Sequence, residues 1–217
     1  MHVRINLLTA DPSRLDDLVN YVESEARMII LDKPGNLGMS MAVSTLATAV
    51  VETFWVSGDA MRESERQVSA TRVEAARRAG GTVSVEHYTV ASVVEVEPPE
   101  RAAGVRLTRA ETDPAKVDAS VAAYEDAAVP WLVDTDGLCT ARLYVDRRTG
   151  RSIVETLWTD MSALVASRSV AAAIRVDTVA ASGAVIRGVE EYALAFMSGG
   201  FRPTRTVHAV ASSNRAG

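Results

Sequence analysis

The sequence VETFW at residues 51–55 returns almost unchanged as VETLW at residues 154–158. Both runs contain the β-branched and aromatic residues that favour strands. Side chains alternate between the two faces of a strand, so Thr53 and Trp55 are expected on one face and Glu52 on the other. A strand present twice in one chain predicts a repeated structural unit.

Further landmarks recur in the same order, about 102 residues apart. VRINLLTADP, starting at Val3, matches VRLTRAETDP, starting at Val105. VEHYTVA, starting at Val85, matches VEEYALA, starting at Val189. We therefore expect an internal duplication.

The duplication predicts two similar domains in tandem. The expected parts are copy one at 1–97, a linker at 98–104, copy two at 105–198 and a tail at 199–217. Pro98 and Pro99 fit the linker because proline cannot continue a strand ladder. The sequence RTVHAV at 205–210 is expected as a short edge strand, and the last residues as disordered.

Each copy shows the same order of expected elements. In copy one we expect strands at 3–8, 38–44, 49–56 and 83–96, and helices from the Asp11-Pro12 pair and at 57–79. In copy two we expect strands from Val105 and at 138–146, 152–159 and 185–196, and helices from the Asp113-Pro114 pair and at 160–181. Aspartate before proline is a common helix start, and a glycine follows the second helix of each copy.

The order β-α-β-β-α-β is that of the ferredoxin-like unit. Its antiparallel sheet carries both helices on one face, and the other, apolar face must be buried. Two copies in one chain can bury these faces against each other. The expected fold is therefore α+β, with two tandem ferredoxin-like units forming an intramolecular α/β-barrel pseudo-dimer.

Composition narrows the classes of function. The chain has 217 residues, a net charge of −5, 47% hydrophobic and 24% charged residues, which is ordinary for a globular protein and argues against a nucleic-acid partner. Its apolar runs are too short to span a membrane, and MHVRIN at the start reads as a strand and not as a signal peptide. A single cysteine, Cys139, excludes an internal disulfide and leads us to expect a cytoplasmic protein.

Cofactor motifs are missing from the sequence. One cysteine and three histidines are too few for a structural zinc site, and neither GxGxxG nor GxxxxGK occurs. We therefore expect no metal and no nucleotide cofactor. The sequence leaves open whether two chains assemble further into a homodimer.

The ETxW strands and the helix starts that follow them, SGDAM at 57–61 and TDMSAL at 159–164, together with the element order, carry a family resemblance. The chain resembles the antibiotic-biosynthesis monooxygenases of the dimeric α/β-barrel superfamily. This resemblance implies a cofactor-independent monooxygenase that uses O₂ to oxidise an aromatic polyketide-type molecule, such as an anthrone, without metal or flavin. It also implies that the substrate lies between the sheet and the helices of a copy.

The chain departs from this family at two places. Where members commonly carry a histidine or an aromatic residue after the strand tryptophan, this chain has Ser64 and Ser167. Asn6 resembles the asparagine on the first strand of related haem-degrading proteins, but copy two has Thr108 there. The tryptophan and haem-ligating histidine on the second helix of those proteins are also missing, so haem degradation is the weaker alternative.

Trp55 and Trp158 are candidates for stacking on a flat aromatic ligand. The alternative, which is the commoner role, is that both pack between helices and sheet. Arg72 and Arg175 are candidates for binding a phenolate or carboxylate through paired hydrogen bonds. Their alternative is an exposed ion pair with a glutamate such as Glu52 or Glu86.

Tyr88 and Tyr192 each follow a glutamate, Glu86 and Glu190, on the same face of the last strand. A tyrosine hydroxyl beside a carboxylate is a candidate for proton transfer to or from a substrate phenol. The alternative is a half-buried strand tyrosine.

Some candidates occur in copy one alone. His87 is a candidate general base and Asn6 a candidate for orienting a carbonyl or O₂-derived group, although a lone histidine is more often structural. Met39 and Met41 would give an adaptable lining. We therefore expect copy one to hold the active cleft, with Asn6, Trp55, His87 and Tyr88 as catalytic residues.

Three functions stay open at this point. The chain is expected to be an oxygenase, a non-catalytic protein that binds a hydrophobic small molecule, or a module that binds a protein partner. A cavity lined by Asn6, Trp55 and Arg72 would favour the first two. A cleft filled by methionine and leucine side chains would favour the third.

Overall fold

The computed structural model describes residues 1–199, so the edge strand expected at 205–210, with His208, lies outside the described residues. Within the first half of the chain the helices and strands are β1 (His2–Thr9), a 3₁₀ turn (Pro12–Arg14), α1 (Leu15–Tyr21), a π-helical segment (Val22–Ala26), α2 (Arg27–Leu31), β2 (Asn36–Val43), β3 (Thr48–Trp55), α3 (Gly58–Ala79) and β4 (Val83–Glu95). We call this part the N-terminal half.

The C-terminal half repeats this order. After a 3₁₀ turn at Pro99–Arg101, its elements are β5 (Gly104–Glu111), a second 3₁₀ turn (Pro114–Lys116), α4 (Val117–Ala127), α5 (Val129–Val133), β6 (Leu138–Asp146), β7 (Arg151–Trp158), α6 (Met161–Ala166), α7 (Arg168–Ser182) and β8 (Val185–Ser198). None of the helices in the described part of the chain combines the length and apolar character that a membrane-spanning helix requires.

The helix starts at the Asp-Pro pairs and the helix ends at glycine are present as predicted. The Asp11 carboxylate accepts a hydrogen bond from the Ser13 backbone N–H, and Asp113 caps the matching turn through Ala115. Gly80 and Gly183 end the long helices in the left-handed conformation, which glycine adopts without strain.

One expected helix is interrupted. We expected a single helix at 160–181, but the structure divides it into α6 and α7 at Ser167. The Ser167 hydroxyl donates to the Leu164 carbonyl at 2.7 Å, a local bond that competes with helical pairing. The Arg106 guanidinium donates to the same carbonyl at 2.7 Å. In the N-terminal half Ser64 and Arg4 bind the Met61 carbonyl in the same way while α3 stays continuous, so these bonds do not account for the break.

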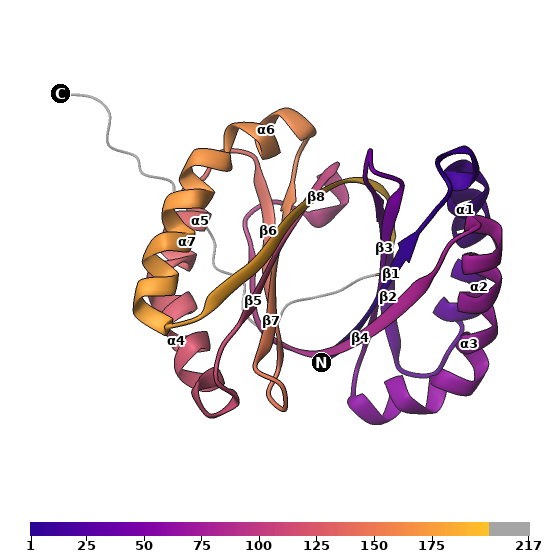
Figure 1. Ribbon diagram of the computed structural model, residues 1–217, viewed down its shortest axis with the longest axis horizontal. Coiled ribbons are helices and arrows are strands. Elements are labelled where there is room, and N and C mark those ends of the chain that lie inside the picture. Colours follow the sequence, from indigo (N-terminus) through magenta and orange to yellow (C-terminus); the bar gives the residue numbers. More distant parts are fainter. Residues whose placement is uncertain (200–217) are drawn as a thin grey trace.

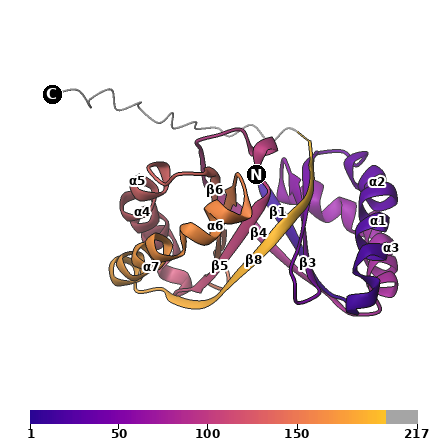
Figure 2. The same cartoon turned by 90° about the horizontal axis from the view of Figure 1, so that it is seen from above.

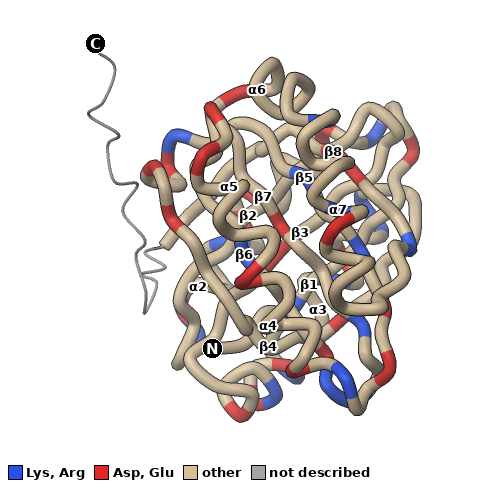
Figure 3. Tube along the Cα trace, turned by 90° about the vertical axis from the view of Figure 1, so that its left-hand side faces the viewer, with Lys and Arg blue, Asp and Glu red and all other residues tan. Residues whose placement is uncertain are grey.

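The strands of the described chain form one closed antiparallel barrel, in the order β1-β3-β2-β8-β5-β7-β6-β4. The last strand of each half joins the two halves, because β4 pairs with β1 and then with β6, while β8 pairs with β5 and then with β2. Figures 1 and 2 show α1–α3 outside one wall of the barrel and α4–α7 outside the opposite wall. On the side shown in Figure 3, acidic and basic residues are interspersed.

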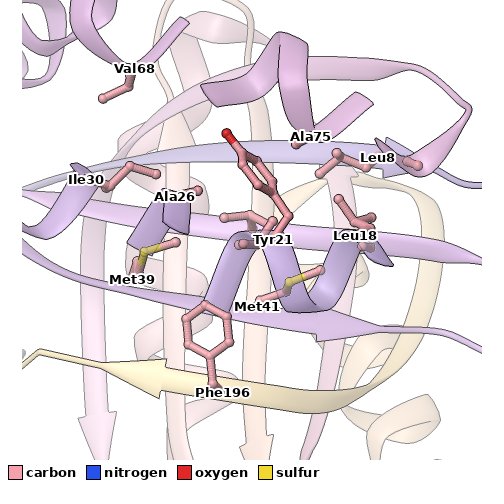
Figure 4. Packing of buried hydrophobic residues seen from close by; sticks show 14 residues of the cluster. Leu8, Leu18, Tyr21, Ala26, Ile30, Met39, Met41, Val68, Ala75 and Phe196 are labelled. Atoms are coloured by element: carbon pink, nitrogen blue, oxygen red, sulfur yellow. The ribbon is translucent and has the colours of Figure 1, made fainter. Parts of the chain in front are cut away.

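Apolar side chains form three buried clusters. One lies between α1–α3 and the sheet of the N-terminal half, one inside the barrel, and one between α4–α7 and the sheet of the C-terminal half. Figure 4 shows the first, in which Phe196 from β8 packs beside Met39 and Met41 of β2. The predicted alternation of VETFW is confirmed, since Val51 belongs to the first cluster and Phe54 to the barrel interior.

Candidate functional site

A buried arginine lies over the tryptophan in each half. The Arg4 guanidinium lies 5.4 Å from the Trp55 ring centre, and that of Arg106 lies 5.6 Å from the Trp158 ring centre. Both tryptophans are almost fully buried, and each indole N–H donates to the threonine two residues earlier in its strand. A cation over an aromatic face in a desolvated layer is an attractive contact, so each pair stiffens its helix–sheet interface.

The serines that follow the tryptophans bind these arginines. Arg4 donates to the Ser64 hydroxyl at 3.2 Å and Arg106 to the Ser167 hydroxyl at 2.9 Å. Arg4 also donates to the Met61 carbonyl. At these positions, where the chain departs from the family pattern, the structure therefore has hydrogen-bond acceptors for a buried guanidinium.

The two halves use different counter-ions for the buried arginine. In the N-terminal half Arg4 pairs with Glu65 of α3 at 3.1 Å, and its Nε lies 3.4 Å from His87 Nε2. In the C-terminal half Arg106 pairs with Glu191 of β8 at 2.9 Å. The pKa of His87 is lowered, first by partial loss of solvent and then by the charge of Arg4. Its neutral form is therefore the favoured one near pH 7.

A cavity of about 100 Å³, partly open to solvent, lies in the C-terminal half between α4, α7 and the sheet. Its walls are mostly aliphatic, and Trp158, Arg106 and Arg175 also line it. On this measure a single water needs only about 10–15 Å³, so the space suits a ligand of several heavy atoms.

The corresponding cleft of the N-terminal half is nearly full, with a cavity of about 30 Å³. Its side chains are larger than those at the matching positions of the C-terminal half. The strand registers and the Asp-Pro turns identify the matching positions. These pairs, N-terminal residue first, are Leu8 and Ala110, Leu18 and Ser120, and Val68 and Ala171. The cavity in the C-terminal half therefore results from smaller residues within a common framework.

Three hydroxyl groups that line this cavity have no hydrogen-bond partner among the described residues. They belong to Thr112, Ser120 and Tyr124. Tyr124 is 3% exposed, and burial raises its pKa, so its hydroxyl keeps its proton and can donate. A buried hydroxyl without a partner is costly, so this wall is suited to a ligand or water that accepts a hydrogen bond.

The four residues expected to be catalytic do not converge on one site. Asn6 lines the small N-terminal cavity, where its Nδ2 donates to the Val51 carbonyl at 3.2 Å. Trp55 is buried, lines neither cavity and lies against the Arg4 guanidinium, which binds α3. His87 contacts Arg4 on the helix side of β4, whereas Tyr88 belongs to the cluster inside the barrel.

Tyr192 also lies inside the barrel, as alternation along β8 requires. Its hydroxyl donates to Glu190 at 2.9 Å, as the pairing of tyrosine and glutamate along the strand predicted. Arg109 joins this group by donating to Glu190 at 3.0 Å and to Glu86 at 2.7 Å. The group links the two halves of the barrel, and the two helix-side cavities lie on the other face of the sheet.

Met39 and Met41 do not line a cavity; both are buried in the N-terminal cluster (Figure 4). Arg72 makes an ion pair, as the alternative reading held, but with Glu65 and not with Glu52 or Glu86. Trp158 and Arg175 both line the C-terminal cavity. The larger cavity thus lies in the C-terminal half, whereas we had expected the active cleft in the N-terminal half.

Sequence reasoning missed Arg106, Ser120 and Tyr124 as cavity residues. Arg106 belongs to the repeated Val-Arg pair at the start of each copy, and this repetition was a usable signal. The exchange of Leu18 for Ser120 on the apolar face of a helix was another. Among residues 1–199, no group of three or more His, Cys, Asp or Glu is placed to hold a metal ion.

No family model matches the sequence. The uncharacterized proteins Rv2557 and Rv2558 of Mycobacterium tuberculosis are 24% and 27% identical to the chain, covering 84% and 90% of it and 82% and 84% of their own lengths.

Solved structures share the fold. An anthrone oxidase-like protein has a TM-score of 0.66 at 14% identity, covering 91% of this chain and 93% of its own. A candidate monooxygenase of Lactobacillus acidophilus NCFM has a TM-score of 0.65 at 10% identity, covering 91% and 95%. The predicted resemblance to monooxygenases of this type is confirmed at the level of the fold.

Proposed function

We propose that the chain is a monooxygenase-like protein that binds an aromatic small molecule in the cavity of the C-terminal half and oxidises it with O₂. The observation that carries this proposal is the cavity itself, an aliphatic space beside Trp158 with unpartnered hydroxyls and arginine at its walls. A mostly apolar cavity with a few polar groups is the usual form of a small-molecule site.

The proposed reaction requires few catalytic groups from the protein. The anion of an electron-rich phenol gives an electron to O₂, and Arg106 and Arg175 favour the anionic form of a bound phenol. With anthrone as substrate, the methylene carbon becomes a carbonyl that holds one oxygen atom. The two hydrogens of the methylene leave with the second oxygen atom as water.

A second candidate function is binding without turnover. It is favoured by one observation: the residues that line the C-terminal cavity include no histidine, aspartate or glutamate. An enzyme usually removes a proton from its substrate with a general base within reach. The polar side chains that line this cavity carry only hydroxyl and guanidinium groups.

We also propose that the two halves are copies of one ferredoxin-like unit, with residues 1–97 and 105–198 acting as an intramolecular pseudo-dimer. The repeated element order and the exchange of last strands between the halves support this proposal. The polar residues that bridge the barrel interior would then hold a permanent interface.

Oxygen uptake with anthrone in metal-chelated buffer tests the proposed function. Uptake above the spontaneous rate is expected for the wild type and for Asn6→Ala, and loss of uptake for Ser120→Leu. The leucine fills the C-terminal cavity just as Leu18 fills the N-terminal cleft. Uptake that survives Ser120→Leu but not Asn6→Ala would move the site to the N-terminal half. Anthrone binding without uptake would favour the second candidate.

A further inference from the structure

The charges beside the two cavities differ, although the framework is shared. In the N-terminal half Glu65 serves two arginines, pairing with Arg4 and, through both guanidinium nitrogens, with Arg72. Arg72 lines the small cavity of that half. Its guanidinium group thus already has a carboxylate partner inside the protein.

In the C-terminal half the position that matches Glu65 is Arg168, one residue after Ser167. The acid of this half is Glu191, which pairs with Arg106 at 2.9 Å and also with Arg168. Arg175, the match of Arg72, makes no ion pair or hydrogen bond with any residue in the described part of the chain. Three arginines therefore share one carboxylate around the larger cavity.

Arg175 is half-buried and lines the cavity. Burial and the charge of Arg106 both lower its pKa, which means that this position disfavours the cation. Arginine nevertheless keeps its proton in proteins. The charge of Glu191 acts on this pKa in the opposite direction, but no carboxylate contacts Arg175 in the described part of the chain. Such a half-buried cation at the wall of an apolar cavity is a suitable partner for an anion brought by a ligand.

We infer that the cavity of the C-terminal half binds an apolar monocarboxylate, whose carboxylate pairs with the Arg175 guanidinium. The planar fork of arginine matches the two oxygens of a carboxylate, and the aliphatic walls accept the ring or chain of the ligand. The inference rests on the proposed function, because it assigns the ligand class of the same cavity. It adds that the ligand must carry a negative charge, whereas the proposed function requires only an aromatic ring.

Calorimetric titration with phenylpropionate and its neutral analogue phenylpropanol tests the inference at neutral pH. The two probes share ring and chain and differ only in the charged group. We expect phenylpropionate to bind about tenfold more tightly or better, and Arg175→Gln to abolish that preference while leaving phenylpropanol binding unchanged. Arg72→Gln in the N-terminal half is the matched control and is expected to change neither affinity.

The outcomes separate this inference from the proposed function. Equal binding of the two probes by the wild type, or a carboxylate preference that survives Arg175→Gln, would overturn the carboxylate site and leave the cavity as a neutral site. Binding of neither probe would overturn the carboxylate site and count against the cavity as a ligand site. Loss of the preference in Arg72→Gln alone would move the anion site to the N-terminal half.

Discussion

The carboxyl groups of Glu52 and Glu155, one from each VET run, are both buried inside the barrel, and the charge of Glu155 acts on Glu52. Arg142 and Tyr144 both donate to Glu155, at 2.8 and 2.6 Å, and Ser40 donates to Glu52 at 3.2 Å. Two carboxyl groups buried this near each other favour a state in which one of them keeps its proton, because two buried negative charges repel. The repeated glutamates are therefore stable together in the barrel only while one of them is protonated.

This pair predicts an unusual dependence of stability on pH. Burial and then the charge of Glu155 raise the pKa of Glu52 well above its usual value of 4.5, so the folded state holds a proton that the unfolded state has lost. The pair's contribution to the free energy of unfolding is thus complete below pH 4.5 and is lost as pH rises through the folded-state pKa. Between pH 4.5 and the folded-state pKa of Glu52, the free energy of unfolding falls by about 1.4 kcal/mol per pH unit.

Glu52→Gln is expected to remove this dependence, since the amide is neutral at every pH. Urea unfolding of wild type and variant between pH 5 and 8 measures the difference, which should grow with pH in favour of the variant. Glu155→Gln is the matched control. It takes away the negative charge that pairs with the buried Arg142 and should cost about 3 kcal/mol at pH 6. Equal slopes for wild type and Glu52→Gln would contradict the retained proton.

The two tryptophans predict different responses to a ligand, although their surroundings are alike. Trp158 lines the C-terminal cavity, Trp55 lines neither cavity, and Trp131 is 60% exposed. Phenylpropionate is therefore expected to change the tryptophan fluorescence of the wild type and of Trp55→Phe, but not that of Trp158→Phe. Tryptophan-selective excitation measures this during titration. A response that persists in Trp158→Phe and vanishes in Trp55→Phe would move the bound ring to the other half.

Leu18 and Ser120 predict unequal costs of truncation at matched positions. Leu18 is fully buried in the N-terminal cluster, and its truncation to alanine leaves a cavity that should cost about 3 kcal/mol of unfolding free energy. The Ser120 hydroxyl has no partner among the described residues, so Ser120→Ala should cost less than about 1 kcal/mol. Denaturant unfolding compares the two. Similar losses would mean that Ser120 is packed as tightly as Leu18.

The recurring landmarks and the strand alternation predicted the α+β class and the antiparallel barrel. VETFW gave a strand with Phe54 and Trp55 on opposite faces, and the Asp-Pro pairs gave the helix starts. The closed barrel also followed, because two sheets with bare faces must cover each other. The break at Ser167 was not predicted, because Ser64 at the matching position makes the same hydrogen bonds within a continuous helix.

The site was less predictable because it depends on differences between the halves. His87 and Met39, which have no equivalent in the C-terminal half, were candidates, and the structure places Met39 in the N-terminal cluster and His87 beside Arg4. The cavity arises where the C-terminal half has smaller residues, and a smaller side chain does not form a recognisable sequence motif. Arg175 was a candidate for binding an anion because of its guanidinium group. Only the structure showed that no carboxylate contacts it in the described part of the chain, whereas Arg72 contacts Glu65.

A final prediction concerns two glycines with similar backbone angles, Gly150 before β7 and Gly183 before β8. Both have positive φ, at 77° and 66°. A Cβ at Gly150 would lie 1.9 Å from the Thr112 carbonyl oxygen, whereas one at Gly183 would meet nothing within 4 Å. Gly183→Ala should therefore cost only the left-handed strain, about 1 kcal/mol. Gly150→Ala should cost more than about 2 kcal/mol, because backbone must move.

The position of Thr112 gives this comparison a functional readout. Thr112 lines the C-terminal cavity, so the backbone shift in Gly150→Ala should also weaken the binding of phenylpropionate, whereas Gly183→Ala should leave it unchanged. Thermal unfolding and calorimetric titration on the same samples measure both effects. Equal stability of the two variants would show that the backbone at the β5–β7 end moves at little cost. Weakened binding in Gly183→Ala would show that strain at the end of α7 affects the cavity.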